Sequence, residues 1–186
     1  DDFSLPVEKL LGACDEKTKA IFLCSPNNPS GNAIPNAVIY EVLDRFNGMV
    51  IVDEAYIDFC SEPTLLKDLD KYPNLIVFQT FSKARGLAAL RLGLAFSQEY
   101  VIELMSMVKY PYNINESTQR LALEALNGSI DAQVEEIISQ RGRVAEELKK
   151  LRAKVNDSTG FIGEYVLKEA LDEAIRRLAT NKKELQ

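Results

Sequence analysis

Lys83 is the residue of this chain whose type and surroundings most clearly permit covalent chemistry. It lies within residues 79–93, which read QTFSKARGLAALRLG, so it follows an apolar run and has hydroxyl and small residues beside it. A lysine amine is a nucleophile only when it is unprotonated, and partial burial and a nearby cation both favour that state. Arg91 follows closely in the chain and could supply the cation while holding an anionic group. Most isolated Ser-Lys pairs lie on solvated surfaces, so the interpretation depends on the neighbouring segments.

Two other apolar runs also end in polar residues. Residues 20–24 (AIFLC) precede SPNNPSG at 25–31, and residues 49–52 (MVIV) precede DEAY at 53–56. The lysine segment itself follows LIVF at 75–78. Short apolar runs that alternate with helical stretches are typical of buried strands in a parallel sheet. The carboxyl ends of such strands meet at one edge, where open α/β sheets bind ligands. We therefore expect an amide, a carboxylate with a phenol, and a lysine with hydroxyls at one edge.

In order and spacing, these motifs resemble those of the fold-type I pyridoxal-phosphate aminotransferases. The residues that carry the resemblance are NNPSG at 27–31, DEAY at 53–56, and SKARG at 82–86 together with Arg91. Within that group the segments 24–29, 52–59, 72–77 and 109–115 are similar to the histidinol-phosphate aminotransferases. The match runs from about Asp2 to about Leu151, so the chain resembles a partial copy of such an enzyme.

The resemblance implies a role for four residues around the cofactor ring. Lys83 would be the catalytic residue: it would form the internal aldimine with pyridoxal 5'-phosphate and then move the proton at the substrate α carbon. Asp53 would pair with the protonated pyridine nitrogen, although an aspartate after a strand is also a common helix N-cap. Asn28 and Tyr56 would hydrogen-bond the phenolic oxygen of the cofactor. An Asn-Pro-Ser-Gly turn and a core tyrosine are the structural alternatives.

The resemblance also implies a phosphate site and a substrate side. Thr80, Ser82 and Arg91 would bind the cofactor phosphate, since hydroxyls and a planar guanidinium match its oxygens. Arg85 stands where the family usually has a neutral residue, and we expect it to face solvent. The substrate-side candidates lie in one aromatic segment: Tyr110, Tyr112 and Asn113. That segment could equally pack between helices.

Composition narrows the alternatives. The 186 residues include no histidine, which excludes Ser-His and Cys-His triads and any histidine-ligated metal. Three cysteines without metal spacing predict no metal site and a reducing, cytoplasmic location. The net charge of −6 without a basic stripe argues against nucleic acid as a partner. No apolar stretch approaches the roughly 20 residues that span a bilayer, so no membrane partner is expected.

The predicted fold is α/β: a mostly parallel sheet flanked by helices, resembling the second half of the pyridoxal-phosphate transferase large domain, with a helical C-terminal part. We expect strands at 19–24, 49–52, 75–78 and 90–96, and helices at 7–13, 35–46, 64–69, 98–108, 116–126 and 131–155. Residues 1–155 would form a partial cofactor-binding domain. Residues 156–186 would be a helical segment that does not match the family's small domain, with a loop at 156–160 and an amphipathic helix at 161–186.

The function that follows from the resemblance is transamination between an amino-phosphate of the histidinol-phosphate type and 2-oxoglutarate, through Lys83. Two alternatives stay open at this point. One is an amino-acid-phosphate decarboxylase on the same core, and the other is an inactive fragment or interaction module that retains the motifs. A sheet of about four strands would expose its edges and an apolar face, which favours a homodimer or a missing partner segment.

Overall fold

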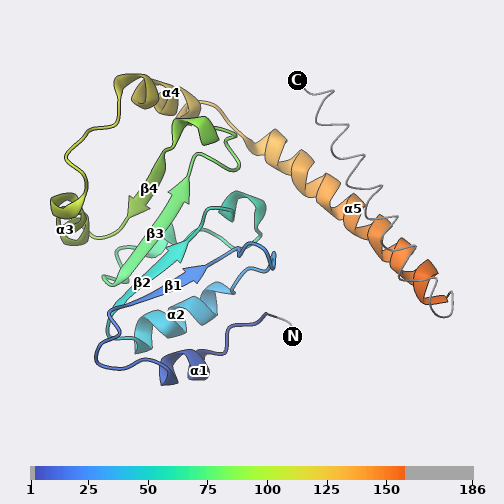
Figure 1. Cartoon of the computed structure of the whole chain (residues 1–186), viewed down its shortest axis with the longest axis horizontal. Helices are drawn as coiled ribbons and strands as arrows, with labels where there is room; N and C mark the ends of the chain where they lie inside the picture. The colour runs from blue at the N-terminus through green and yellow to red at the C-terminus, as the bar shows by residue number, and fades with distance from the viewer. Residues whose placement is uncertain (1–2, 158–186) are drawn as a thin grey trace. The chain divides into compact units, whose positions relative to one another are not determined.

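The computed structural model describes residues 3–157, which include a four-stranded sheet (Figure 1). The strands are β1 (Ala20–Cys24), β2 (Met49–Asp53), β3 (Leu75–Thr80) and β4 (Gly93–Phe96), and they are neighbours in that order. β1, β2 and β3 run parallel, whereas β4 runs antiparallel to β3. The α/β class and the mostly parallel sheet are thereby confirmed.

One face of this sheet, which we call the covered face, carries the main core. It receives every second residue of the parallel strands, because side chains alternate between the two faces of a strand. Two helices supply the covering layer: α1 (Val7–Gly12) and α2 (Asn36–Arg45). The buried residues that form this core are Ile21, Leu23, Ile34, Ile39, Val42, Leu43, Val50, Val52, Leu65, Tyr72, Leu75 and Val77. Burial of this apolar surface is the main source of stability for the sheet.

The opposite face, which we call the open face, has a much smaller core. Its buried residues are Ile51 and Ile76 from the sheet and Val101 from helix α3 (Glu99–Val108). Phe22 in β1 points to this face and is 68% exposed. The prediction of a buried strand therefore holds for only one side of β1, since its covered-face residues are buried and the others are exposed.

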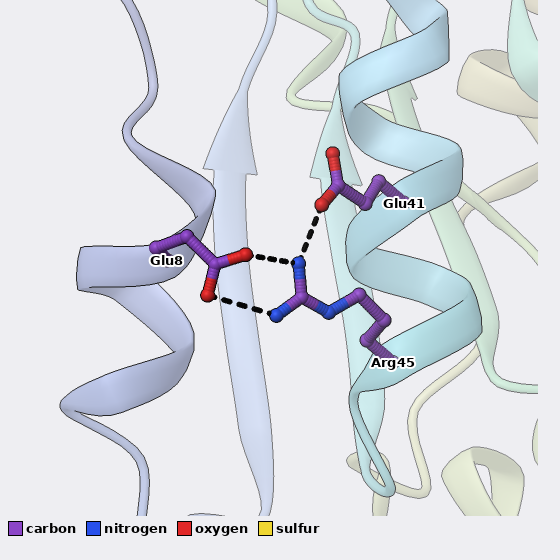
Figure 2. A network of polar contacts seen from close by, with 3 residues as sticks. All are labelled: Glu8, Glu41 and Arg45. Carbon is purple, nitrogen blue, oxygen red and sulfur yellow. Dashed lines mark hydrogen bonds and ion pairs between the residues drawn. The ribbon is translucent and has the colours of Figure 1, made fainter.

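A three-residue ion-pair network ties α1 to α2 (Figure 2). Arg45 of α2 donates to both carboxylate oxygens of Glu8 in α1, at 2.7 and 3.0 Å, and also to Glu41 one turn earlier in α2. The hydrogen bond from Arg45 and its positive charge lower the pKa of Glu8 below its ordinary value of 4.5. The two helices are thereby linked by a solvent-exposed guanidinium as well as by their apolar contacts.

Two further helices follow the sheet: α4 (Glu116–Leu126) and α5 (Asp131–Asp157). Short 3₁₀ helices occupy Ile57–Phe59, Leu65–Asp68 and Ala88–Leu90. Asn115 caps α4, because its side chain accepts a hydrogen bond of 2.8 Å from the Thr118 backbone amide. The chain divides into two compact units, residues 1–134 and residues 135–186. Within the second unit, α5 carries the ion pairs Glu146–Lys149 and Glu147–Lys150.

Three predicted boundaries need correction. β4 begins at Gly93 rather than at residue 90, because Ala88–Leu90 form a 3₁₀ helix and Arg91 adopts a left-handed backbone conformation. The segment predicted as a helix at 64–69 is a 3₁₀ helix. α5 continues through Asp157, so the first two residues of the predicted 156–160 loop are helical. The predicted helix at 161–186 lies outside the described residues, and the division into domains 1–155 and 156–186 stays a prediction.

In the described part of the chain, no helix is both long enough and apolar enough to cross a membrane. The same residues contain no group of histidine, cysteine or acidic side chains that could hold a metal ion. Cys14, Cys24 and Cys60 are free thiols.

Candidate functional site

The carboxyl ends of β1, β2 and β3 form one continuous edge, as the sequence predicts. Cys24 is in register with Asp53, and Asp53 is in register with Phe78. Beyond the strands the backbone pairing continues, because Ser25 N donates to Asp53 O at 3.0 Å and Glu54 N donates to Phe78 O at 2.8 Å. The loops that carry the candidate residues therefore begin at strand ends that backbone hydrogen bonds hold together.

Asp53 is the last residue of β2 and is half-buried. It alternates with Val52, whose side chain lies in the covered-face core, so the Asp53 side chain belongs to the open face. Its Oδ1 accepts a hydrogen bond of 3.0 Å from the Ala55 backbone amide. This is a local aspartate turn, which orients the carboxylate at the strand end. The alternative of a helix N-cap is wrong, because the next helix is the 3₁₀ helix Ile57–Phe59 and Tyr56 is its N-cap.

Three candidate residues from three different strand ends come together around the Tyr56 side chain. Asn28 Nδ2 donates a long hydrogen bond of 3.5 Å to the Tyr56 hydroxyl. On the ring itself, Lys83 Nζ lies 5.0 Å from the Tyr56 centroid, within the range of a cation–π contact. An amide, a phenol and a primary amine thus converge where the sequence predicts them.

The loop that carries Lys83 is closed by backbone hydrogen bonds. Gly86 N donates to Lys83 O at 2.9 Å, and Gly86 has φ +66°, which a residue with a side chain rarely adopts. Leu87 N donates to Phe81 O at 3.0 Å, which completes the turn. The Lys83 side chain is exposed in the part of the chain that the structure describes, so the expected partial burial is not observed. Its position comes from the loop and the Tyr56 ring.

Of the three residues predicted to bind the cofactor phosphate, Thr80 and Ser82 lie together, but the Arg91 side chain does not join them. Thr80 Oγ1 accepts from Ser82 N at 3.1 Å and donates to Leu92 O at 3.4 Å. Arg91 precedes Leu92, so its backbone lies beside this strand end. Its side chain donates instead to Ala88 O at 3.3 Å and is exposed. The backbone of Arg91 is left-handed, with φ +50°, which is unusual for a residue other than glycine.

Arg85 does not face solvent as we expected. It is half-buried, and its guanidinium donates to Ala125 O near the end of α4 at 2.8 Å. The guanidinium carbon also lies 5.8 Å from the centre of the Phe81 ring. A cation is favoured at a helix carboxyl end, because the last carbonyls carry partial negative charge. Arg85 therefore fastens the Lys83 loop to α4.

The substrate-side candidates stand apart from this cluster. Tyr110 and Tyr112 are each 84% exposed, and Asn113 is exposed in the same segment between α3 and α4. The alternative that this segment packs between helices is therefore wrong for the two tyrosines. Their predicted role toward a substrate stays a prediction.

Glu54, which directly follows Asp53 in the chain, is a buried acidic residue beside the site. It is 2% exposed, and its carboxylate accepts hydrogen bonds from Thr64 Oγ1 at 2.6 Å, Leu65 N at 2.8 Å and Gln79 Nε2 at 2.9 Å. A pocket of about 150 Å³ lies beside it, lined in part by Gln79, Thr80 and Arg85. Of the predicted cofactor residues only Thr80 lines this pocket, so the pocket is distinct from the Asp53–Tyr56–Lys83 cluster.

Comparison with known proteins places this arrangement in context. The family described as "Aminotransferase class I and II" matches residues 1–183. A histidinol-phosphate aminotransferase from Bacteroides thetaiotaomicron is 48% identical over 168 residues, covering 87% of this chain and 49% of that protein. The chain thus spans about half the length of the curated relatives it matches.

Two solved structures have a similar fold. An aspartate aminotransferase from Thermotoga maritima shares 26% identity with a TM-score of 0.69, over 81% of this chain and 42% of that one. A histidinol-phosphate aminotransferase from Sinorhizobium meliloti in complex with pyridoxal-5'-phosphate has a TM-score of 0.69 at 23% identity, over 84% of this chain and 43% of that one. At that identity the second likeness concerns the fold alone.

Proposed function

This chain belongs to the class I and II aminotransferases, and on that premise we propose that it forms the lysine-bearing half of a pyridoxal-phosphate-dependent transaminase. The observation that carries the proposal is the convergence of Asn28, Tyr56 and Lys83, which come from three strand ends, at the sheet edge that also bears Asp53. A shared fold alone would not require these side chain types at these positions.

The donor set fits pyridoxal phosphate chemically. A carboxylate at the end of a mostly apolar strand suits a protonated pyridine nitrogen, which is the role proposed for Asp53. The Asn28 amide and the Tyr56 hydroxyl are already paired and could both hydrogen-bond a phenolic oxygen. Thr80 and Ser82 offer hydroxyls to a phosphate, and Arg91 is proposed as its cationic partner. The bound cofactor would supply an electron sink for charge that develops at the substrate α carbon.

Lys83 has two proposed tasks that depend on its present position. Its Nζ would be the attachment point for the cofactor's carbonyl carbon, and it would then carry the proton to and from the substrate α carbon. The contact with the Tyr56 ring holds Nζ beside that ring. The Gly86 turn and the Arg85 bond to α4 fix the loop, so a proton transfer at Nζ needs little rearrangement of the backbone.

The proposed reaction partners are small molecules: an amino-phosphate of the histidinol-phosphate type as amino donor and 2-oxoglutarate as acceptor. Support comes from the 48% identity to the histidinol-phosphate aminotransferase. Tyr110, Tyr112 and Asn113 are proposed to reach the substrate. A homodimer is proposed as the assembled state, because large apolar side chains of α3 and α4 are exposed, including Met107, Val108 and Leu123.

The test is a pyridoxal-phosphate titration of the chain, followed by borohydride reduction and peptide mapping. We expect saturable binding and a reduced cofactor adduct on Lys83. In the transamination assay, Lys83→Ala should lower the rate by roughly 10²–10⁴-fold or more, because proton transfer by a positioned group contributes about that much. Lys17→Ala serves as the matched control and should keep the rate. Lys17 is also exposed, but it precedes the amino end of β1 rather than following a carboxyl end.

Three results would oppose the proposal. An adduct on a lysine other than Lys83 would remove its assigned role. Release of carbon dioxide without amino transfer would replace the transaminase by a decarboxylase on the same core. Cofactor binding without turnover of either kind would indicate an interaction module.

A further inference from the structure

Glu54 and Gln79, which adjoin Asp53 and Thr80 in the chain, are hydrogen-bonded to each other on the covered face of the sheet. Asp53 and Thr80 belong to the open face, as do Ile51 and Phe78 before them. Glu54 and Gln79 each adjoin one of these two residues, so their side chains point the opposite way. Gln79 Nε2 donates to Glu54 Oε2 at 2.9 Å. Asp53 and Thr80 are therefore each adjacent in the chain to one member of a hydrogen-bonded pair.

We infer that Glu54 and Gln79 are a positioning pair that sets the spacing of Asp53 and Thr80 for the cofactor. The inference rests on the proposed function, since it concerns the same site. Among the described residues, neither side chain has a hydrogen bond to the proposed ring or phosphate ligands, so both act through their neighbours in the chain. Side-chain bonds matter at this point because the register of β2 with β3 ends at Asp53 and Phe78, and the backbone bond from Glu54 N to Phe78 O follows it. Beyond Phe78, Gln79 and Thr80 are in register only with β4.

The environment of Glu54 makes the pair stiff. Its carboxylate is almost fully buried, and it accepts hydrogen bonds from three neutral donors: a hydroxyl, a backbone amide and a side-chain amide. A buried carboxylate depends on each of these bonds, because water cannot replace them. Thr64 receives a second bond of 3.3 Å from Gln79 Nε2, which closes a triangle among the three side chains. The pair therefore has a single favourable arrangement.

Because one member of the pair is an acid and the other an amide, substitutions at Glu54 and Gln79 should have different effects alone and in combination. Gln79→Glu places a second carboxylate where the amide donated, so the two acids repel and the strand ends should separate. Glu54→Gln combined with Gln79→Glu restores one acid and one amide in reversed order, with the Leu65 amide still facing an acceptor oxygen. Leu75→Ala is the control for stability alone, because it removes packing from the covered face without touching either partner.

The experiment measures pyridoxal-phosphate affinity and the absorbance spectrum of the bound cofactor in the full chain, at a temperature where every variant is folded. We expect Gln79→Glu to weaken cofactor binding by about tenfold or more, as expected for losing a hydrogen bond to a charged group. The double variant should recover most of that loss and the original spectrum. Leu75→Ala should lower the melting temperature without changing either property. Equal loss of affinity in Leu75→Ala and Gln79→Glu would overturn the inference, as would failure of the double variant to recover.

A second readout needs no cofactor. Hydrogen exchange of the peptides covering residues 53–56 and 80–83 should be faster in Gln79→Glu and should return toward the original rate in the double variant. If the unsubstituted chain takes up no pyridoxal phosphate, the proposed function fails, and the exchange rates alone then decide whether the pair positions these two segments. Unchanged exchange in Gln79→Glu would overturn the inference.

Discussion

The covered and open faces of the sheet differ in what their residues contribute. On the covered face, Val50, Val52, Leu75 and Val77 are completely buried beneath α1, α2 and the loops that join them. On the open face, the strand ends carry Asp53 and Thr80, while Phe22 remains largely exposed. The same three strands therefore supply stability through one face and candidate chemistry through the other. Sequence alternation allows both because consecutive side chains point in opposite directions.

The sharpest way to test this difference is to truncate one apolar side chain on each face. Leu75→Ala should lower the free energy of unfolding by about 2–5 kcal/mol, because it leaves a cavity in a close-packed core. Phe22→Ala, on the open face, should change it by less than about 1 kcal/mol, since a largely exposed ring loses little burial. Urea unfolding of both variants gives the two values. Similar losses at the two positions would mean that both faces are packed in solution.

A smaller effect is expected at Arg91, where the backbone conformation itself opposes stability. A left-handed residue with a side chain costs roughly 1–2 kcal/mol, and glycine avoids most of that cost. We expect Arg91→Gly to be more stable than Arg91→Ala by about 1 kcal/mol, after allowing for the greater freedom of glycine in the unfolded chain. Both variants should lose phosphate affinity to the same extent.

Thermal and urea unfolding of the two Arg91 variants, with pyridoxal-phosphate titrations of each, check this prediction. An alanine variant as stable as the glycine variant would show that residue 91 is not left-handed in solution. In that case the connection between β3 and β4 would be no more strained than the strands themselves.

The smallest effect concerns how α1 is held over the covered face. Because Arg45 lowers the pKa of Glu8 below 4.5, the folded state favours the ionised carboxylate. The ion pair therefore contributes its full stability above pH 4.5, and that contribution is lost as the pH falls through the lowered value. Glu8→Gln should remove this acid sensitivity, with a change smaller than at Leu75 or Arg91 because the pair is exposed.

The measurement is the urea midpoint of the original chain and of Glu8→Gln at pH 7 and at pH 3. The difference between the two proteins should be largest at pH 7 and should shrink at pH 3, where Glu8 is protonated. A difference that grows toward acid pH would contradict the assignment of the shift to Arg45.

The sequence predicts the strands and the meeting of their polar ends, but not the partners that distant segments supply. The apolar runs at 20–24, 49–52 and 75–78 lie within or match β1, β2 and β3, because burial demands apolar residues there. Which face of β1 is covered depends on helices elsewhere in the chain. The burial of Arg85 also depends on a distant segment. Its partner, the Ala125 carbonyl, lies forty positions away, so the residues around Arg85 do not indicate the contact. Lys83, Asn28 and Tyr56 were recognisable because their motifs are local.

The antiparallel direction of β4 also has a consequence for the order in which the chain can fold. Residues 81–92 leave β3 and return to the same edge, so Thr80 comes into register with Gly93 through a short connection. Closing a short loop costs little entropy, whereas the parallel pairings of β1 with β2 and of β2 with β3 must wait for longer crossovers. The amine of Lys83 and the hydroxyls of Thr80 and Ser82 thus belong to a local hairpin that can form early. Asn28 and Tyr56 reach it only when the slower parallel contacts are made.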